Sequence, residues 1–238
     1  MFSPLWLWLW LVVFSSVTHA TAVTVAAATS LRPDLERSLA EFRRVHGIDV
    51  RTVYAASGTL AQQLLHGAPY ALFLSASPEF LDPLQQLGRI CEGPVVIGHG
   101  RLVLYVPKQS TVSLDSGLKE LDTQALERLA IADPSIAPFG RLARQALERA
   151  GLWQKIRGRL VYGDSAAKAA QLALGGAVDA ALLPQRLMRS PAFWKRGNWT
   201  PVDERLYRPV PIMAAWLCGG TAASKALYGF LLEQLGGR

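Results

Sequence analysis

The stretch VTVAAATSLRPDL at residues 23–35 joins an extended apolar run to a helical pattern through the small polar residue Ser30. The same design recurs three times: VRTVYAA (50–56) leads to Ser57, LAIADPSIAPF (129–139) to Gly140, and RLVYGD (159–164) to Ser165. A helix that starts directly after a strand leaves its first N–H groups without internal partners and with partial positive charge. Such helix starts suit anions, and several together can hold a small oxyanion with uncharged donors alone.

The first 22 residues predict a cleaved secretory signal. They contain no Asp, Glu, Lys or Arg, include the apolar run LWLWLWLVVF, and end in Ala20-Thr21-Ala22, the small-x-small form of a signal-peptidase site. A membrane anchor is the alternative, but this apolar run is shorter than the ~20 residues that a membrane-spanning helix needs. We therefore expect an exported, periplasmic protein whose fold is built from the remaining residues.

Charge and cysteine content narrow the function only slightly. The formal net charge is +7, but the basic residues are scattered, so we expect mild attraction of anions and no nucleic-acid partner. Cys91 and Cys218 have no Cys or His neighbour at metal-ligand spacing. After export they can form a disulfide or remain buried thiols, and the sequence leaves both possibilities open.

Apolar runs and helical patterns alternate along the chain. Expected strands are 23–28, 48–54, 70–74, 101–106, 128–132, 158–162, 178–183 and 209–217. Expected helices are 32–45, 59–66 (with Thr59 and Gln62 as a capping box), 78–88, 140–150, 165–175 and 222–235. This order predicts an α/β fold with mainly parallel sheets flanked by helices. Ligands of such sheets bind beyond the carboxyl ends of the strands, and the wide gap between the second and third junctions predicts two lobes around one cleft.

Several motifs resemble the periplasmic molybdate-binding proteins of ABC importers, the ModA family. They are VTVAAATSL, then YAASGTLAQQLLHGAP followed by LFLSA, and IADPSIAPFGRLARQALERAGLW, in this order along the chain. The resemblance implies a two-lobed type II periplasmic-binding-protein fold. Lobe I would comprise residues 23–104 plus 212–238, and lobe II residues 105–211.

The resemblance also implies a ligand, its binding residues and a partner. Molybdate or tungstate would be bound between the lobes and delivered to a membrane permease by a monomeric protein that has no cofactor and no catalytic residue. Ser30 and Ser57 match family ligands that use hydroxyl and backbone donors. Phe139 and Ser165 match positions that act mainly through the backbone N–H.

Three positions depart from the family pattern. A tyrosine hydroxyl that completes the family's ligand set corresponds to Leu183, which has no donor, and two acidic residues correspond to Ala71 and Ser77. A hydrogen bond to a charged partner contributes about 1.5–3 kcal/mol, so its loss weakens binding roughly ten- to a hundredfold. Tyr162 or Arg141 could supply a substitute donor, and a tyrosine restored at position 183 would then be expected to tighten binding.

Two other interpretations remain open at this stage. The serines could be ordinary helix caps, or the protein could bind another anion such as sulfate, a phosphonate or a small carboxylate. A secreted serine hydrolase is less consistent with the sequence, because Ser57 lies in Ala-Ala-Ser-Gly-Thr and lacks the first glycine of G-x-S-x-G. We therefore expect a binding protein and no enzyme.

Overall fold

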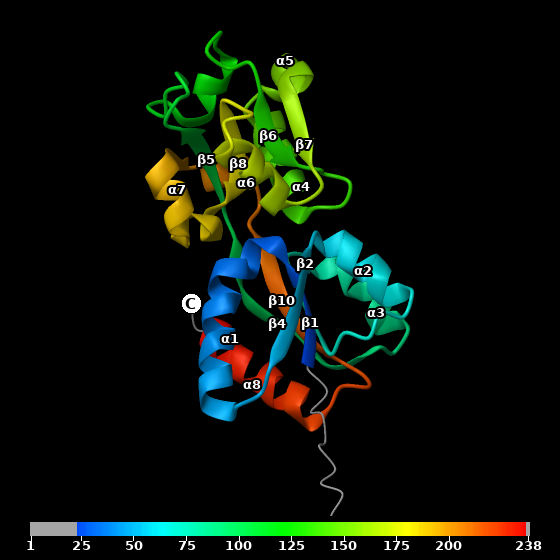
Figure 1. Ribbon diagram of the computed structural model, residues 1–238. Coiled ribbons are helices and arrows are strands. Elements are labelled where there is room, and N and C mark those ends of the chain that lie inside the picture. Colours follow the sequence, from blue (N-terminus) through cyan, green and yellow to red (C-terminus); the bar gives the residue numbers. More distant parts are fainter. Residues whose placement is uncertain (1–22, 237–238) are drawn as a thin grey trace, which may run out of the picture.

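The computed structural model describes residues 23–236, so the predicted signal at 1–22 lies outside the described residues. Residues 23–236 form two five-stranded sheets, each in its own lobe (Figure 1). The first sheet has the order β2-β1-β3-β10-β4 and the second the order β7-β6-β8-β5-β9. Their strands are β1 (Val23–Ala28), β2 (Val50–Ala55), β3 (Leu72–Ser75), β4 (Ile90–Gly100), β5 (Leu102–Pro107), β6 (Leu129–Ala132), β7 (Leu160–Gly163), β8 (Ala180–Pro184), β9 (Gly197–Pro201) and β10 (Val210–Leu217).

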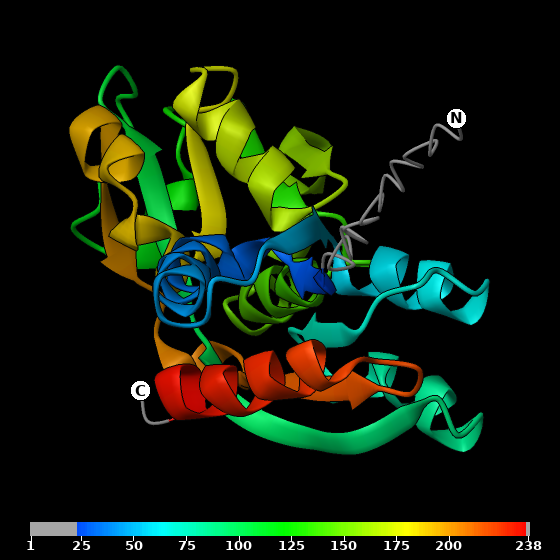
Figure 2. The ribbon, with the colours of Figure 1, turned by 60° about the horizontal axis from the view of Figure 1, so that its bottom comes forward.

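Helices cover both faces of the first sheet. Its helices are α1 (Arg32–His46), α2 (Ser57–Leu65), α3 (Asp82–Gln86) and α8 (Ala222–Gly236), with the short 3-10 turns η1 (Thr29–Leu31) and η2 (Pro78–Phe80). Alternate residues of β1 enter different apolar clusters: Val25 packs with α1 and α8, whereas Ala26 packs with α2 and α3. A strand buried on both faces is apolar at nearly every position, which explains the run VTVAAA, in which Thr24 is the one polar and partly exposed residue. Figure 2 shows α8 beside α1.

The second sheet is covered in the same way. Helices α4 (Pro138–Arg149) and α5 (Trp153–Ile156) pack on one face, and α6 (Ala166–Leu174) and α7 (Pro191–Arg196) on the other. The remaining 3-10 turns of this half of the chain are η3 (Gly117–Asp122), η4 (Arg157–Arg159), η5 (Gln185–Arg189) and η6 (Glu204–Leu206). Among residues 23–236, every helix is too short or too polar to cross a bilayer.

Each sheet has four strands in one direction and one strand in the other. Strands β1, β2 and β3 are parallel, and β10 pairs antiparallel with both β3 and β4. In the second sheet β6, β7 and β8 are parallel, and β5 pairs antiparallel with both β8 and β9. The prediction of mainly parallel sheets flanked by helices is therefore confirmed, with one reversed strand in each sheet.

The reversed strands also correct the lobe boundaries. Strand β5 pairs along its length with the second sheet, so the predicted boundary at residue 104 falls inside a strand. The chain changes sheet at Arg101 instead. It returns between β9 and β10, and β10 already begins at Val210, ahead of the predicted boundary at residue 212.

Two strands and several helix limits differ from the sequence-based expectation. Strands β4 and β9 were not expected, because ICEGPVVIGHG contains three glycines and a proline and GNWTP has no apolar run. Both are edge strands, which need fewer apolar residues because one side faces solvent. The expected helix 78–88 is divided into η2 and α3. Helix α2 begins at Ser57 instead of residue 59, which places Thr59 within the first turn rather than at a cap.

Cys91 and Cys218 form a disulfide with a Cα–Cα distance of 5.0 Å. It joins the start of β4 to the residue after β10, across 127 positions of sequence. Trp216, at the same end of β10, pairs with Leu72 at the start of β3. The disulfide therefore lies at one end of the strands, and the carboxyl ends of β1, β2 and β3 lie at the other.

Replacing both cysteines by serine should lower the free energy of unfolding by about 2–4 kcal/mol, because the cross-link restricts a long loop in the unfolded chain. Urea denaturation of the oxidised wild type and the double variant measures this difference. The wild type treated with a reductant is the matched control and should behave like the variant. Equal urea midpoints for all three samples would contradict the prediction.

Candidate anion-binding site

A small cavity lies where the two lobes meet. Lobe I contributes Ala28, Thr29, Ser30, Ala55, Ala56, Ser57 and Ala76, and lobe II contributes Ala137, Pro138, Phe139 and Ala166. The cavity has a volume of about 10 Å³, which is roughly the space of one water molecule. A tetrahedral oxyanion therefore requires the lining to move apart, and a sugar or an amino acid would require a far larger opening. All of the lining residues are uncharged.

Ser30 lies in η1, between the end of β1 and the start of α1, and is 2% exposed. Its Oγ makes no hydrogen bond with any of the described residues. A buried hydroxyl without a partner costs about 1–3 kcal/mol, so such groups are rare unless a ligand completes them. Because Ser30 lines the cavity, its hydroxyl is the best-defined donor for a small anion.

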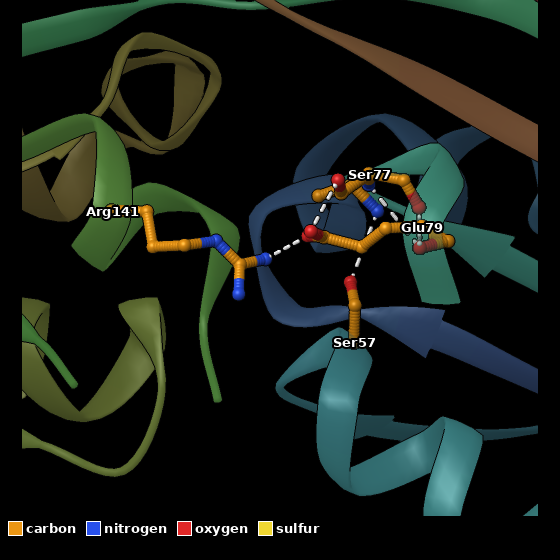
Figure 3. A network of polar contacts seen from close by, with 6 residues as sticks. Ser57, Ser77, Glu79 and Arg141 are labelled. Carbon is orange, nitrogen blue, oxygen red and sulfur yellow. Dashed lines mark hydrogen bonds and ion pairs between the residues drawn. The ribbon is translucent and has the colours of Figure 1, made fainter. Parts of the chain in front are cut away.

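Ser57 is the first residue of α2 and is fully buried. Its Oγ accepts a hydrogen bond from the backbone N–H of Ala76 at 3.0 Å, which leaves the hydroxyl proton available to a ligand. Figure 3 shows this contact at the edge of a polar network that contains Ser77, Glu79 and Arg141. The bond from Ala76 orients the Ser57 hydroxyl toward the segment that follows β3.

Phe139 is the second residue of α4 and lines the cavity from lobe II. Its ring also packs against Gly100, at the end of β4. The helix start is brought close to β6 by Gly140, where a Cβ would lie 2.3 Å from the carbonyl oxygen of Ala132. Pro138 has no N–H, and the N–H groups of Gly140 and Arg141 donate to the carbonyl oxygen of Ala137 at 3.0 and 3.2 Å, so Phe139 supplies the first-turn N–H of α4 that is left for a ligand.

The loop before α4 is ordered by Asp133. Its Oδ1 accepts hydrogen bonds from the Ser135 hydroxyl at 2.7 Å and from the Ser135 backbone N–H at 2.8 Å. These bonds, the hydroxyl first, lower the pKa of the Asp133 carboxyl below its ordinary value. The carboxylate thus orders the loop. Its charge faces Ser135 and not the cavity, because Ser135 does not line the cavity.

Ser165 is the N-cap of α6. Its Oγ accepts from the backbone N–H of Lys168 at 3.2 Å and donates to the Asp164 carboxylate at 3.0 Å. The cavity is lined from this segment by the next residue, Ala166. The Ser165 side chain therefore caps the helix, and its segment can serve an anion only through backbone N–H groups.

Leu183 and the two substitute donors lie away from the lining of the cavity. Leu183 is fully buried in an apolar cluster of lobe II that includes Val103 and Phe193. A tyrosine there would overfill this cluster. We therefore expect Leu183→Tyr to lower the stability of the protein and not to tighten anion binding. Arg141 pairs with Glu79, and Tyr162 is half exposed on β7.

Sequence reasoning missed the alanines that line most of the cavity, because alanine carries no functional group. The available signal was the run of small residues at each junction, AAAT before Ser30 and AA before Ser57. Small side chains let backbone N–H groups approach a ligand closely. Within residues 23–236 no group of three or more His, Cys, Asp or Glu could hold a metal ion.

Residues 23–236 match the family described as bacterial extracellular solute-binding protein, and the chain belongs to this family. Its members are binding proteins, which confirms the expectation that the protein is not an enzyme.

Curated relatives and solved structures agree with this assignment. The molybdate-binding protein ModA of Azotobacter vinelandii is 29% identical over 216 residues, covering 90% of this chain and 85% of the relative. ModA of Rhodobacter capsulatus is 29% identical over 222 residues, covering 89% and 83%. The structure of the Azotobacter vinelandii periplasmic molybdate-binding protein matches with a TM-score of 0.80 at 26% identity, covering 89% of this chain and 92% of that one. The resemblance to the ModA proteins and the type II fold are thereby confirmed.

Ser30→Ala should separate ligand binding from stability. We expect oxyanion affinity to fall roughly ten- to a hundredfold, because a hydrogen bond to a charged ligand contributes about 1.5–3 kcal/mol. The free energy of unfolding should stay the same or rise by up to about 3 kcal/mol, because the substitution removes a buried hydroxyl that has no partner among the described residues. Calorimetry with molybdate as the test anion and urea denaturation give the two quantities.

Ser165→Ala is the matched control, with the opposite pattern. Loss of its cap to Lys168 should lower stability by about 1 kcal/mol, with a smaller effect on affinity than Ser30→Ala. If Ser30→Ala instead destabilises the protein and leaves anion binding intact, Ser30 is a structural residue.

Gly58 makes a backbone contact between the lobes, in which its N–H donates to the carbonyl oxygen of Ile136 at 3.2 Å. A Cβ at Gly58 would lie 2.8 Å from that oxygen. Gly58→Ala should therefore hinder closure, increase the radius of gyration in small-angle X-ray scattering with a saturating test anion, and weaken anion binding. The stability of the free protein should hardly change, because the open lobes relieve the contact. An unchanged radius of gyration together with unchanged affinity would contradict this prediction.

Proposed function

We propose that the protein binds molybdate, or the closely similar tungstate, between its lobes and delivers it to the membrane permease of an ABC importer. The observation that carries the proposal is the buried Ser30 hydroxyl, which lines a cavity of uncharged residues and has no partner among the described residues. Ser57, the start of α4 at Phe139 and the start of α6 after Ser165 add donors from both lobes. The similarity to molybdate-binding proteins over about 90% of the chain supports this choice of ligand.

A donor-only cavity selects for fully ionised oxyanions. Each oxygen of a dianion such as molybdate accepts hydrogen bonds, so hydroxyl and N–H donors can satisfy it completely. An anion that retains a proton brings an O–H group for which this lining has few acceptors, and leaving that group unpaired costs about 1–3 kcal/mol. The site should therefore discriminate against monohydrogen and dihydrogen phosphate.

Sulfate is the second candidate, because it is also a fully ionised tetrahedral dianion. Leu183, which is buried in an apolar cluster, brings no hydroxyl to the cavity, so one donor that the resemblance implies for molybdate is missing and sulfate stays a candidate. Discrimination between the two anions depends on the size of the cavity rather than on protonation. An organic phosphonate or carboxylate fits a cavity of this volume less well.

The proposed mechanism is capture by closure. The anion first meets Ser30 and Ser57 in lobe I, and rotation of lobe II then brings the starts of α4 and α6 around it, which shifts the population toward the closed form. The closed, loaded monomer would dock on the permease. Residues 1–22, as a cleaved signal, would direct the chain to the periplasm.

Calorimetry of the chain beginning at residue 23 tests the ligand. Molybdate and tungstate should bind, and phosphate should bind at least about tenfold more weakly because of its unpaired proton. Bound ligand should also raise the melting temperature by mass action, since the unfolded chain has no site. Ser30→Ala is the control that links the heat of binding to this cavity.

Two results would contradict the proposal. Tighter binding of sulfate than of molybdate would assign the protein to sulfate instead. Absence of both a heat of binding and thermal stabilisation with molybdate, tungstate, sulfate and phosphate would exclude small oxyanions as the ligand class.

A further inference from the structure

Asp34 is a buried carboxylate that connects the two lobes. It lies in the first turn of α1, four residues after Ser30, and its side chain is 1% exposed. Its Oδ2 accepts a hydrogen bond from Nη1 of Arg186 at 2.5 Å, and its Oδ1 accepts one from Arg189. Both arginines belong to η5 of lobe II, directly after β8, so this ion triad joins the two lobes.

The ion triad differs physically from the other contacts of the closed form. The Arg186 side chain is only 13% exposed, so solvent and salt weaken its pairing with Asp34 less than they weaken an exposed pair, whereas Arg189, which is 42% exposed, remains accessible to salt. Arg141 and Glu79 form a second bridge between the lobes, but their side chains are 36% and 51% exposed. Exposed pairs contribute little, and we therefore assign the larger effect to Asp34.

We propose that Asp34 is a positioning residue for anion capture, which stabilises the closed cleft through Arg186 and Arg189 and does not contact the anion. When the lobes part, water hydrates all three charged groups. When they close without a carboxylate at position 34, two guanidinium groups are brought together without a counter-charge, and removing one partner of a buried pair is strongly unfavourable. The apparent affinity of a ligand falls in proportion to the population of the binding-competent form, so Asp34 sets that affinity at a distance.

The triad also places charge near a site whose own lining is uncharged. Two guanidinium groups and one carboxylate leave one net positive charge one helical turn from Ser30. Without the arginines, the Asp34 carboxylate would repel an incoming anion. The two arginines therefore have two effects. They hold the lobes together, and they change the net charge around Asp34 from negative to positive.

The first test uses ligand-free protein and is independent of the ligand. Small-angle X-ray scattering of the wild type and of Asp34→Asn at low and high NaCl compares their radii of gyration. The wild type should be compact at low salt and should expand as salt screens the attraction, whereas Asp34→Asn should be expanded at both. Asp49→Asn is the matched control, because it removes an exposed pair with Arg43 inside lobe I and should behave like the wild type.

The second test rests on the proposed function and uses molybdate as the probe. Asp34→Asn should bind it at least about tenfold more weakly than the wild type, while Glu79→Gln should change the dissociation constant less than about threefold. The triple variant Asp34→Asn, Arg186→Gln, Arg189→Gln removes the unpaired charges and should recover compactness relative to Asp34→Asn. If Asp34→Asn folds poorly, the triple variant still tests the proposal.

The outcomes separate this inference from the proposed function. If the wild type does not bind molybdate but expands at high salt, and Asp34→Asn shows no such change, molybdate is rejected as the ligand and the role of the triad is supported. Equal scattering of wild type and Asp34→Asn, or tighter molybdate binding by Asp34→Asn, overturns the role of Asp34.

Discussion

The first turn of a helix carries N–H groups that the helix itself cannot satisfy, and the candidate site of this protein depends on that constraint. Helix starts of both lobes border one cavity, with α2 contributed by lobe I and α4 by lobe II. Residue 56 alone separates β2 from α2, and the loop 133–137 separates β6 from α4, so both helix starts lie near the carboxyl ends of the strands. Alanine around the cavity and glycine at position 140 permit the close backbone approach that this arrangement needs.

In the proposed function, selection of the anion and closure of the lobes depend on different interactions. Uncharged residues line the cavity, and their hydroxyl and N–H donors would distinguish anions by their protonation. Charged side chains lie outside it, where Asp34 and Glu79 of lobe I meet arginines of lobe II. A charged group inside the cavity would attract any anion, whereas charges at the rim strengthen closure and leave the hydrogen-bond pattern to decide which anion is held.

The crossing strands connect these two functions. The chain passes from β4 to β5 and returns from β9 to β10, so two segments link the lobes. Near this crossing the Tyr207 hydroxyl accepts a hydrogen bond from the backbone N–H of Leu102 at 3.0 Å, and burial raises the pKa of this tyrosine. Phe139 packs on Gly100 in the same region while also lining the cavity. Phe139 therefore connects the crossing to the start of α4 beside the cavity.

The sequence by itself determined the alternation of strands and helices, the junctions at Ser30 and Ser57, and the division into two lobes, because local apolar patterns and turn residues encode them. It did not indicate the edge strands β4 and β9, whose pairing with β10 and β5 compensates for their glycines, proline and polar residues. Only the tertiary structure joined Cys91 to Cys218 and brought Asp34 to Arg186, 152 residues further along the chain. It also placed Leu183 in an apolar cluster, because the direction of a side chain depends on the register of its strand and on its neighbours across the sheet. Contacts between distant segments leave no local pattern, and for this protein they decide how the lobes close.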